Sequence, residues 1–504
     1  MSVPWWRSAV IYQVYPRSFA DADADGVGDL PGITRHLEYV RDLGADAVWL
    51  SPIYRSPMKD FGYDIADHTD VDPIFGSLAD ADALIARAHE LGLRVILDFV
   101  PNHTSDLHPW FADSRASRDA AKRDWYVWRD GEELPNNWVS TFGEHEPAWA
   151  RDHATGEWYL HSFLPEQPDL NWDEPAVESA MHDVMRFWLR RGVDGFRMDV
   201  VQKIGKDPGL GDNEPGRRHD EDWPSVHPRL AAIRRVLDEF DGDRVAVGEV
   251  YLLDQRALAP YITSGDELHL AHNFYFLHLP WSAERFRAAV DEFELLTTDG
   301  GWPAWCLNNH DHSRTATRYG RARARVAAVM VLSLRGTPFL YQGEELGLTD
   351  GAVPPDGIVD VDGRDPERVP MPWQPGPGTG FTSGRAWLPT HQDADRLAVS
   401  VQAGDPASSL ELYRALIRLR RATPALQHGS YRSVHAAPDV FAYVRQHERE
   451  RVLVALNFAP FPRPLPADAD GARLLLSTEA EPRDGELAAD EARVFELSDP
   501  DAGP

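Results

Sequence analysis

At 504 residues the chain is longer than a single domain usually is, so we expect two or three folded units around a large buried core. Its net charge of −30 excludes nucleic acid and anionic membranes as partners, because proteins that bind phosphate groups concentrate lysine and arginine. We therefore expect a neutral or cationic partner. Acidic residues distributed along a chain can also do no more than keep the protein soluble, so the charge identifies no substrate. The single cysteine, Cys306, rules out an intramolecular disulfide.

The amino-terminal stretch MSVPWWRSAVIYQVYP has no charged leader followed by an apolar segment and a small-residue cleavage site. The sequence also has no run of about 18 apolar residues, the length that a membrane-spanning helix needs. We therefore expect neither a signal peptide nor a membrane span. The simplest expectation is a cytoplasmic protein.

Short strand-like segments, each followed by a helical pattern, recur along the chain. The predicted strands cover residues 9–16, 45–52, 93–101, 193–201, 243–251, 268–276, 302–311 and 337–346. The predicted helices cover residues 30–44, 78–92, 178–192, 228–240, 282–296, 324–336 and 409–426. This alternation builds a parallel sheet. Eight units fit an α/β fold of the (β/α)₈ TIM-barrel type better than a doubly wound sheet, which usually has fewer repeats and a glycine-rich first turn.

The surplus length lies in the loops after the predicted strands. Residues 102–172 are long enough for a small inserted domain after the third strand, and 203–226 and 349–408 are further irregular stretches. After Thr423 the helical pattern ends at Pro424, and alternating runs such as VFAYVRQ predict antiparallel strands. We expect a barrel over 1–101 and 173–423, an inserted domain over 102–172 and a C-terminal antiparallel β domain over 424–504.

The stretch FADADADGVGDLPGI follows the first predicted strand and runs into the first predicted helix. Its oxygen-bearing residues follow the ligand spacing of an EF-hand calcium loop, although Gly32 stands where the bidentate glutamate belongs and the flanks form no helix pair. Two interpretations stay open at this point: an EF-hand-like metal loop within another fold, and an acidic surface turn. The candidate ligands are Asp21, Asp23, Asp25, the Val27 carbonyl and Asp29.

Three carboxylates stand at the ends of predicted strands: Asp199 in GFRMDV, Glu249 in GEVY and Asp311 in NNHD. An acid at the end of an apolar strand is costly to bury, so it is usually paired or functional, and three on one barrel face favour function. A pair of carboxylates can cleave a glycosidic bond, one attacking the anomeric carbon while the other protonates the leaving oxygen.

Neighbouring residues suit the same chemistry. Arg197 lies two positions before Asp199 on the same strand face, where it can keep that acid ionised. His103 and His310 can donate hydrogen bonds to sugar hydroxyls, although a lone histidine is more often a packing residue. Aromatic side chains suit the apolar faces of a pyranose ring, with core packing as the alternative for each of them: Tyr63, Phe163 and Trp172.

The segments DFVPNHTS, GFRMDV, GEVY and NNHD resemble, in order and spacing, the four signature regions of the α-amylase family of glycoside hydrolases. QPDLN resembles the form found in the oligo-1,6-glucosidase subfamily, and GYDIADH and GRDPERVPMPW are similar to segments of exo-acting α-glucosidases. The resemblance covers nearly the whole chain. It implies a retaining exo-α-glucosidase that removes terminal α-linked glucose from the non-reducing end of short oligosaccharides.

The resemblance also implies individual roles. Asp199 becomes the nucleophile, Glu249 the general acid/base and Asp311 the stabiliser of an oxocarbenium-like sugar. Asp64 would hold the 4-hydroxyl of the terminal glucose together with an arginine of GRDPER, Arg364 as first choice and Arg368 as the alternative. The loop of residues 21–29 becomes a structural Ca²⁺ site, and no organic cofactor is expected. Asp23 stands where the family pattern has asparagine, which keeps an oxygen ligand.

Val200, directly after the implied nucleophile, bears on linkage preference. In family members that resemble this one, valine at this position tends to accompany action on α-1,6 bonds, and alanine or threonine action on α-1,4 bonds. Two rival functions remain: a transglycosylase or isomerase of the same family, such as a trehalose synthase or sucrose isomerase, and a non-catalytic interaction domain on the same fold. The intact carboxylates and the absence of a membrane span argue against the last.

Overall fold

The computed structural model describes residues 3–143 and 146–498. Its centre is an eight-stranded parallel sheet in the order β11-β10-β9-β5-β2-β1-β13-β12, and a parallel bridge between His272 and Ala304 joins the two ends into a barrel. The strands are β1 (Ile11–Val14), β2 (Ala47–Leu50), β5 (Arg94–Phe99), β9 (Gly195–Met198), β10 (Val245–Gly248), β11 (Leu270–Ala271), β12 (Ala304–Trp305) and β13 (Thr337–Tyr341). The predicted TIM barrel is confirmed.

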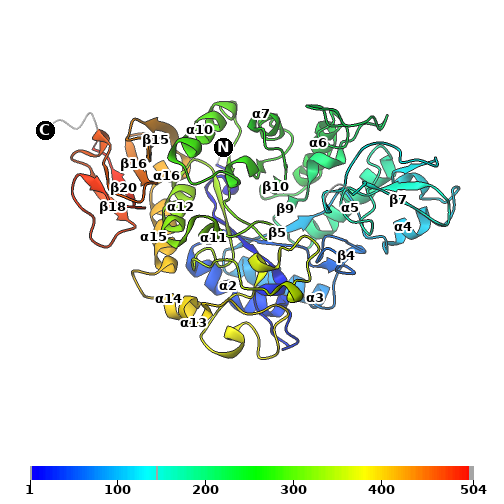
Figure 1. The fold of residues 1–504 in the computed structure, drawn as a ribbon, viewed down its shortest axis with the longest axis horizontal. Helices are drawn as coiled ribbons and strands as arrows, with labels where there is room; N and C mark the ends of the chain where they lie inside the picture. Colours follow the sequence, from blue (N-terminus) through cyan, green and yellow to red (C-terminus); the bar gives the residue numbers. More distant parts are fainter. Residues whose placement is uncertain (1–2, 144–145, 499–504) are drawn as a thin grey trace.

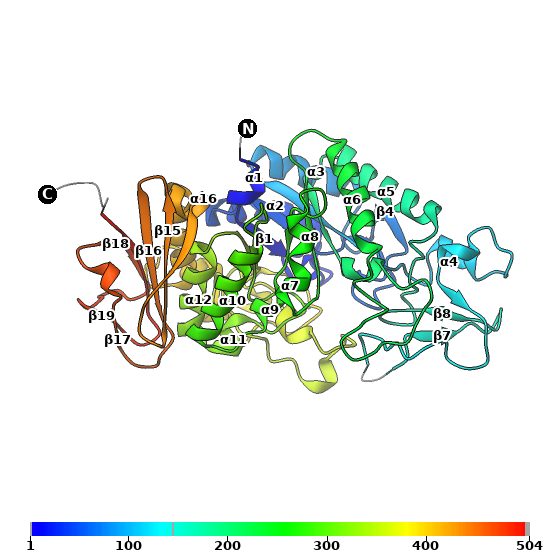
Figure 2. The same cartoon turned by 90° about the horizontal axis from the view of Figure 1, so that it is seen from above.

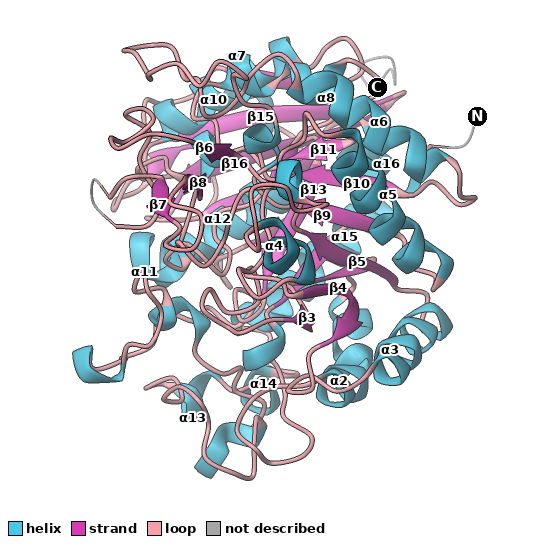
Figure 3. Cartoon of the chain, turned by 90° about the vertical axis from the view of Figure 1, so that its right-hand side faces the viewer, coloured by secondary structure: helices cyan, strands magenta, loops and turns pink. Residues whose placement is uncertain are grey.

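Helices cover the outside of the barrel (Figures 1 and 2). The long ones are α2 (Leu30–Leu43), α3 (Leu78–Glu90), α5 (Pro175–Arg190), α6 (Val226–Asp238), α10 (Ala283–Leu296), α12 (Arg321–Ser333) and α15 (Ser409–Ala422). Local sequence sets where they begin: Asp29 caps α2 by accepting from Gly32 N, and Ser77 and Asp80 form a capping box on α3. Figure 3 shows α3, α5 and α6 outside β5 and β9.

Strand residues alternate between two apolar layers. Ile11, Trp49 and Ile96 point into the barrel, where they form one buried cluster with Val245 and Val247. The residues between them belong to a larger cluster packed against the helices, for example Tyr12, Val48, Leu50, Val95 and Leu97. Because every second side chain of a strand points to the same face, Asp98 and Arg197 also lie in the barrel interior.

Three details differ from the predicted elements. The segments 268–276 and 302–311 form only the two-residue strands β11 and β12, because the sheet closes through a single bridge there, and helix α9 (Phe274–Leu277) begins within the first segment. The unit after β10 has two one-turn helices, α7 (Gln255–Leu258) and α8 (Pro260–Thr263). Pro424 begins a further short helix, α16 (Pro424–His428), because proline fits the first turn of a helix.

The stretch between β5 and α5 carries helix α4 (Pro109–Ser114) and a small antiparallel sheet, β6 (Trp128–Arg129), β8 (Trp158–Leu160) and β7 (Trp149–Arg151). It lies at one end of the molecule (Figure 1). A bridge between His103 and Asp169 ties its beginning to its end. A second small hairpin, β3 (Tyr54–Arg55) with β4 (Asp67–Val71), carries the loop of residues 56–66.

The C-terminal sheet lies at the opposite end of the barrel (Figures 1 and 2). Its strands pair antiparallel in the order β14-β15-β16-β20-β18: Ser430–Val434, Val440–His447, Glu450–Asn457, Ala492–Glu496 and Arg473–Ser477. The short strands β17 (Arg463–Pro464) and β19 (Glu486–Leu487) form a second ladder. The remaining short helices are α1 (Trp5–Ser8), α11 (Thr315–Tyr319), α13 (Ala394–Leu397) and α14 (Val399–Gln402).

Throughout the described ranges, every helix is too short or too polar to span a bilayer. The cytoplasmic location expected from the sequence stays a prediction.

Candidate active site

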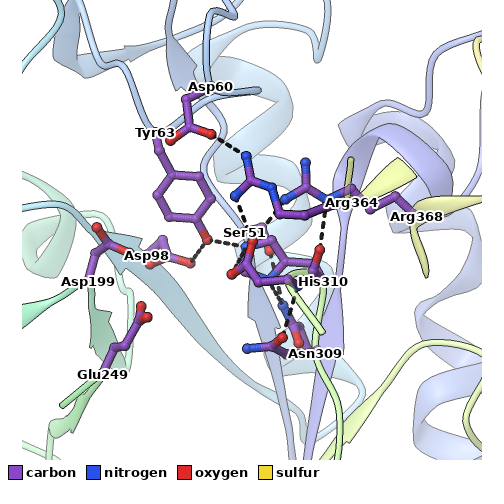
Figure 4. A network of polar contacts seen from close by, with 12 residues as sticks. Ser51, Asp60, Tyr63, Asp98, Asp199, Glu249, Asn309, His310, Arg364 and Arg368 are labelled. Carbon is purple, nitrogen blue, oxygen red and sulfur yellow. Dashed lines mark hydrogen bonds and ion pairs between the residues drawn. The ribbon is translucent and has the colours of Figure 1, made fainter. Parts of the chain in front are cut away.

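The three predicted carboxylates meet at one cavity of about 290 Å³. Asp199 and Glu249 directly follow neighbouring strands, β9 and β10, and backbone bonds from Asp199 N to Phe99 O (2.8 Å) and from Glu249 N to Met198 O (2.7 Å) continue the sheet pattern to both acids. Asp311 lies beyond β12, where its N–H donates to Asn309 Oδ1 (2.9 Å). Figure 4 shows Asp199 and Glu249 side by side at the ends of their strands. The barrel thus brings together acids that are up to 112 positions apart in the chain.

Arg197 connects the acids from beneath. Its fully buried guanidinium donates to Asp98 (2.8 Å) and Asp199 (2.9 Å), and also to Glu249. Burial nevertheless raises the pKa of Asp199 to about 7: Arg197 opposes the shift, and Asp98, Asp311 and Asp60 add to it. The expectation that Arg197 keeps Asp199 ionised is therefore only partly right: the arginine lowers the pKa of Asp199, but burial outweighs it.

Asp311 has the opposite electrostatic environment. Burial alone would raise its pKa, but His310, Arg364 and Arg368 outweigh burial and hold the pKa well below the usual value. Both arginines donate to Asp311 Oδ1 at 2.9 Å. Asp311 therefore stays charged at every pH near neutrality, whereas Asp199 titrates.

Besides Asp311 and Asp360, Arg364 pairs with Asp60, and the prediction that it acts together with Asp64 is wrong. Arg364 donates to Asp60 Oδ1 (2.6 Å), and both residues line the cavity (Figure 4). Asp64 is fully buried away from the cavity, and its carboxylate accepts from Ser56 Oγ (2.8 Å) and from the N–H groups of residues 59 and 60. The two acids face opposite ways because Phe61 and Gly62, at φ 44° and 112°, reverse the chain between them. Arg368 is buried behind the cavity and bonds to His310 O (2.7 Å).

Three residues that the sequence predicts as sugar contacts line the cavity: Tyr63, His103 and Phe163. His310 does not line it: its ring is fully buried, with Nε2 against the Tyr63 hydroxyl (2.7 Å) and Nδ1 against Gln13 Nε2 (2.8 Å). Its contact with a sugar hydroxyl stays a prediction. Trp172 lies elsewhere, in the wall of a second cavity, where it donates to Pro101 O (2.8 Å).

Val200 also lines the cavity, at a backbone φ of 36°. A β-branched residue rarely adopts this left-handed conformation, so the turn after Asp199 is strained. No sequence pattern indicated the other lining residues, most of which come from loops. Asp60 alone had a usable signal, since it stands three positions before the Tyr63 of the quoted motif. The others are Thr141, Phe142, Gln202, Lys203, Arg218, Glu221, Tyr251, His312 and Asp362.

The acidic loop brings three of its predicted ligands together. One carboxylate oxygen each from Asp21, Asp23 and Asp29 lies within 4.8 Å of the other two. Asp25 is not part of this group and accepts from Val27 N (2.7 Å), so its prediction as a ligand lacks support. An all-oxygen, all-carboxylate donor set suits Ca²⁺. Burial raises the pKa of Asp29, and Asp23 and Asp21 add to this shift.

The cavity can perform acid–base and nucleophilic chemistry on a small neutral polyol. Once it is ionised, Asp199 can attack the anomeric carbon of a glycoside. Glu249 can protonate the oxygen that leaves, and Asp311 supplies a fixed negative charge. The Asp60–Arg364 pair offers an acceptor and a donor to a hydroxyl at the wall of the cavity.

The comparisons with known proteins agree with this geometry. The family model described as "Alpha amylase, catalytic domain" matches residues 13–429, and a domain of unknown function, DUF3459, matches 429–494. The chain is 44% identical to a probable alpha-glucosidase of Rhizobium meliloti, covering 90% of this chain and 89% of that one. It is 36% identical to an oligo-1,6-glucosidase of Parageobacillus thermoglucosidasius, with 90% of each chain covered.

Solved structures show the same fold along the whole length. An alpha-glucosyl transfer enzyme superimposes with a TM-score of 0.93 at 40% identity, covering 99% of this chain and all of that one. The trehalulose synthase of Pseudomonas mesoacidophila also has a TM-score of 0.93, at 35% identity and the same coverage.

Proposed function

Because the chain belongs to the α-amylase family of glycoside hydrolases, we propose that it is a retaining exo-α-glucosidase acting on short oligosaccharides with terminal α-1,6- or α-1,4-linked glucose. The observation that carries the proposal is the ion pair of Asp60 and Arg364 in the cavity that Asp199, Glu249 and Asp311 share. The Asp60–Arg364 ion pair is held at 2.6 Å and largely excluded from solvent, so it suits the terminal sugar of a chain. A sugar chain that continued past this point would have to displace the pair.

The reaction uses the three acids in sequence. Asp199 attacks the anomeric carbon and forms a glycosyl ester, while Glu249 gives its proton to the leaving oxygen. Glu249 then takes a proton from water, which attacks the same carbon and releases Asp199 and glucose with the original configuration. The negative charge of Asp311 stabilises the positive charge that develops on the sugar ring.

Transfer to a second sugar is an alternative outcome of the same reaction. Similarity to an alpha-glucosyl transfer enzyme and to a trehalulose synthase supports this alternative, because water and a sugar hydroxyl compete for one glycosyl ester. Incubation with isomaltose, maltose, sucrose and trehalose, followed by product identification, separates glucose release from transfer and isomerisation.

Two substitutions test the assignment of roles. Asp199→Asn should fold but lose nearly all turnover, because an amide cannot form the ester. Glu249→Gln should recover part of its activity with 4-nitrophenyl α-glucoside, whose leaving group needs little protonation. Turnover of Asp199→Asn at the wild-type rate would disprove the proposal.

We also propose that the loop of residues 21–29 holds a structural Ca²⁺. Asp21, Asp23 and Asp29 would be its carboxylate ligands, as their clustering and all-oxygen chemistry support. When bound, the ion would neutralise carboxylates that otherwise repel one another.

A further inference from the structure

Asp64 is a buried acid that the reaction does not use. Its side chain is 0% exposed and lies outside the catalytic cavity. Burial raises the pKa of Asp64 to about 6, hydrogen bonds to the carboxylate oppose this shift, and the charge of Asp60 adds to it. A charged group is costly to bury, so the hydrogen bonds that compensate it indicate what the acid stabilises.

All three hydrogen bonds to the Asp64 carboxylate come from the short loop that carries Asp60. Oδ1 accepts from Ser56 Oγ (2.8 Å) and from Asp60 N (3.0 Å). The other oxygen, Oδ2, accepts from Lys59 N (2.9 Å), and Ser56 Oγ accepts in turn from Met58 N (2.9 Å). None of these partners belongs to a barrel strand or a helix, so the carboxylate stabilises the loop and not the barrel.

The loop needs this support because its backbone is strained. Met58 and Phe61 have positive φ values of 62° and 44°, and Gly62 follows at 112°. Residues other than glycine rarely adopt this conformation, which persists only where the surroundings enforce it. Asp60 lies between the two strained residues, so a relaxed turn would move its carboxylate.

Phe61 is held from the other side of the same turn. The guanidinium of Arg17 lies over the Phe61 ring, 5.0 Å from its centroid. Phe61 does not line the cavity, whereas Asp60 lines it and accepts from Arg364 at 2.6 Å (Figure 4). Contacts on both sides thus fix the turn with the Asp60 carboxylate facing Arg364.

We propose that Asp64 is a positioning residue, which holds the turn of residues 58–62 so that Asp60 reaches the 4-hydroxyl of the terminal glucose. The inference rests on the proposed glucosidase function. Asp64 touches no substrate and acts through Asp60, whose carboxylate accepts the hydrogen bond of that hydroxyl beside Arg364. Loss of the Asp64 carboxylate therefore weakens recognition of this one hydroxyl.

The test compares two substrates that differ only at the 4-hydroxyl. They are 4-nitrophenyl α-glucoside and its 4-deoxy analogue, which share the leaving group and every other hydroxyl. In the wild type, kcat/KM for the glucoside should exceed kcat/KM for the analogue at least about tenfold, because the analogue lacks a hydrogen bond to a charged group. In Asp64→Asn this ratio should fall about 3- to 10-fold, because an amide nitrogen cannot accept from a backbone N–H and the turn loses its anchor.

Asp152→Asn is the matched control. Asp152 is also buried and also holds a turn, since its carboxylate accepts from Thr155 N (2.9 Å) and Thr155 Oγ1 (3.0 Å), but it lies in the inserted domain. This variant should keep the wild-type ratio. Ser56→Ala removes one of the three bonds to Asp64 and should lower the ratio about 2- to 3-fold, so failure of Asp64→Asn to fold still leaves a test.

A double variant separates positioning from a general structural role. Because Asp64 acts through Asp60, the variant with both Asp60→Asn and Asp64→Asn should have the same ratio as Asp60→Asn alone. A further fall of the ratio in the double variant overturns the proposal.

The proposal is also overturned by a wild-type ratio near 1, or by an unchanged ratio in Asp64→Asn even if both rates fall together. Failure of the proposed function gives a different result, since the wild type would then hydrolyse neither substrate.

Discussion

A single buried arginine organises the catalytic acids. Arg197 contacts Asp98, Asp199 and Glu249, and it is 0% exposed, so it cannot exchange these partners for water. One positive charge shared among three acids leaves each of them partly uncompensated. Burial, to which the charges of Asp98, Asp311 and Asp60 add, therefore outweighs the adjacent cation and raises the pKa of the proposed nucleophile.

The first prediction concerns the pH dependence of catalysis. Asp199 attacks only when ionised, and burial raises its pKa to about 7, so kcat/KM should rise with pH through about 7. The negative charge of Asp98 raises that pKa further, so Asp98→Asn should move the acid limb of the profile to lower pH by roughly 0.5–1 unit. The measurement is kcat/KM for 4-nitrophenyl α-glucoside from about pH 5 to about pH 9. An acid limb that stays in place would mean that another group controls it.

The second prediction concerns linkage preference at Val200. Its branched apolar side chain lines the cavity beside Asp199, where a methyl-sized difference shifts substrate preference by roughly 1–3 kcal/mol. Val200→Thr retains the branching and therefore the same backbone strain at φ 36°. The ratio of kcat/KM for isomaltose to that for maltose should fall at least about fivefold in this variant. A constant ratio would show that Val200 only packs the barrel wall.

At the scale of elements, the acidic loop connects two segments that are far apart in the sequence. Asp29 caps α2, and Asp21 accepts from Thr382 Oγ1 (2.5 Å) while its N–H donates to Phe381 O (2.9 Å). The loop therefore joins the first barrel helix to the long stretch after β13. A cation at Asp21, Asp23 and Asp29 would stabilise this junction by binding only the folded state.

The third prediction follows from that junction. Chelation should lower the melting temperature, and added Ca²⁺ should restore it, with a stabilisation of about 2.7 kcal/mol when the free ion is at about 100 times its Kd. Asp21→Asn should abolish most of the Ca²⁺-dependent increase. Asp25→Asn is the matched control, because Asp25 lies outside the carboxylate group. An identical melting temperature in a verified metal-free sample would identify the loop as an acidic turn.

At the scale of the whole molecule, two buried arginines lie where the barrel meets the C-terminal part of the chain. Arg445 on β15 donates to Ser333 O (2.6 Å) at the end of α12 and to Gly429 O (2.9 Å). Arg420 on α15 donates to Gly336 O (2.6 Å) and Leu426 O (3.0 Å). Burial lowers the pKa of Arg445 to about 9 and that of Arg420 to about 10, and these hydrogen bonds all go to backbone carbonyls.

The fourth prediction tests this interface. Arg445→Met should lower the free energy of unfolding by about 2–4 kcal/mol, because several buried carbonyls lose their donor. Calorimetric melting measures the effect. The control is Arg432→Met at an exposed position on β14, which should change stability by less than about 0.5 kcal/mol. A melting temperature equal to that of the wild type would show that water replaces the arginine without cost.

Much of the fold and the catalytic acids could be predicted because the signals are local. The alternation of strand-like segments with helical patterns indicated the barrel, and a position at the end of a strand marked Asp199 and Glu249. The closure of the barrel was harder to predict: β11 and β12 are two residues long, since few backbone bonds are needed where an already curved sheet meets itself.

The sequence by itself determined the barrel, the C-terminal sheet and which acids stand at the strand ends, because each depends on residues near one another in the chain. Only the tertiary structure decided which loop residues meet them. Asp60 rather than Asp64 pairs with an arginine 304 positions away, and two residues of positive φ turn it there. The pKa of Asp199 likewise depends on burial by several loops, a property that no local pattern encodes.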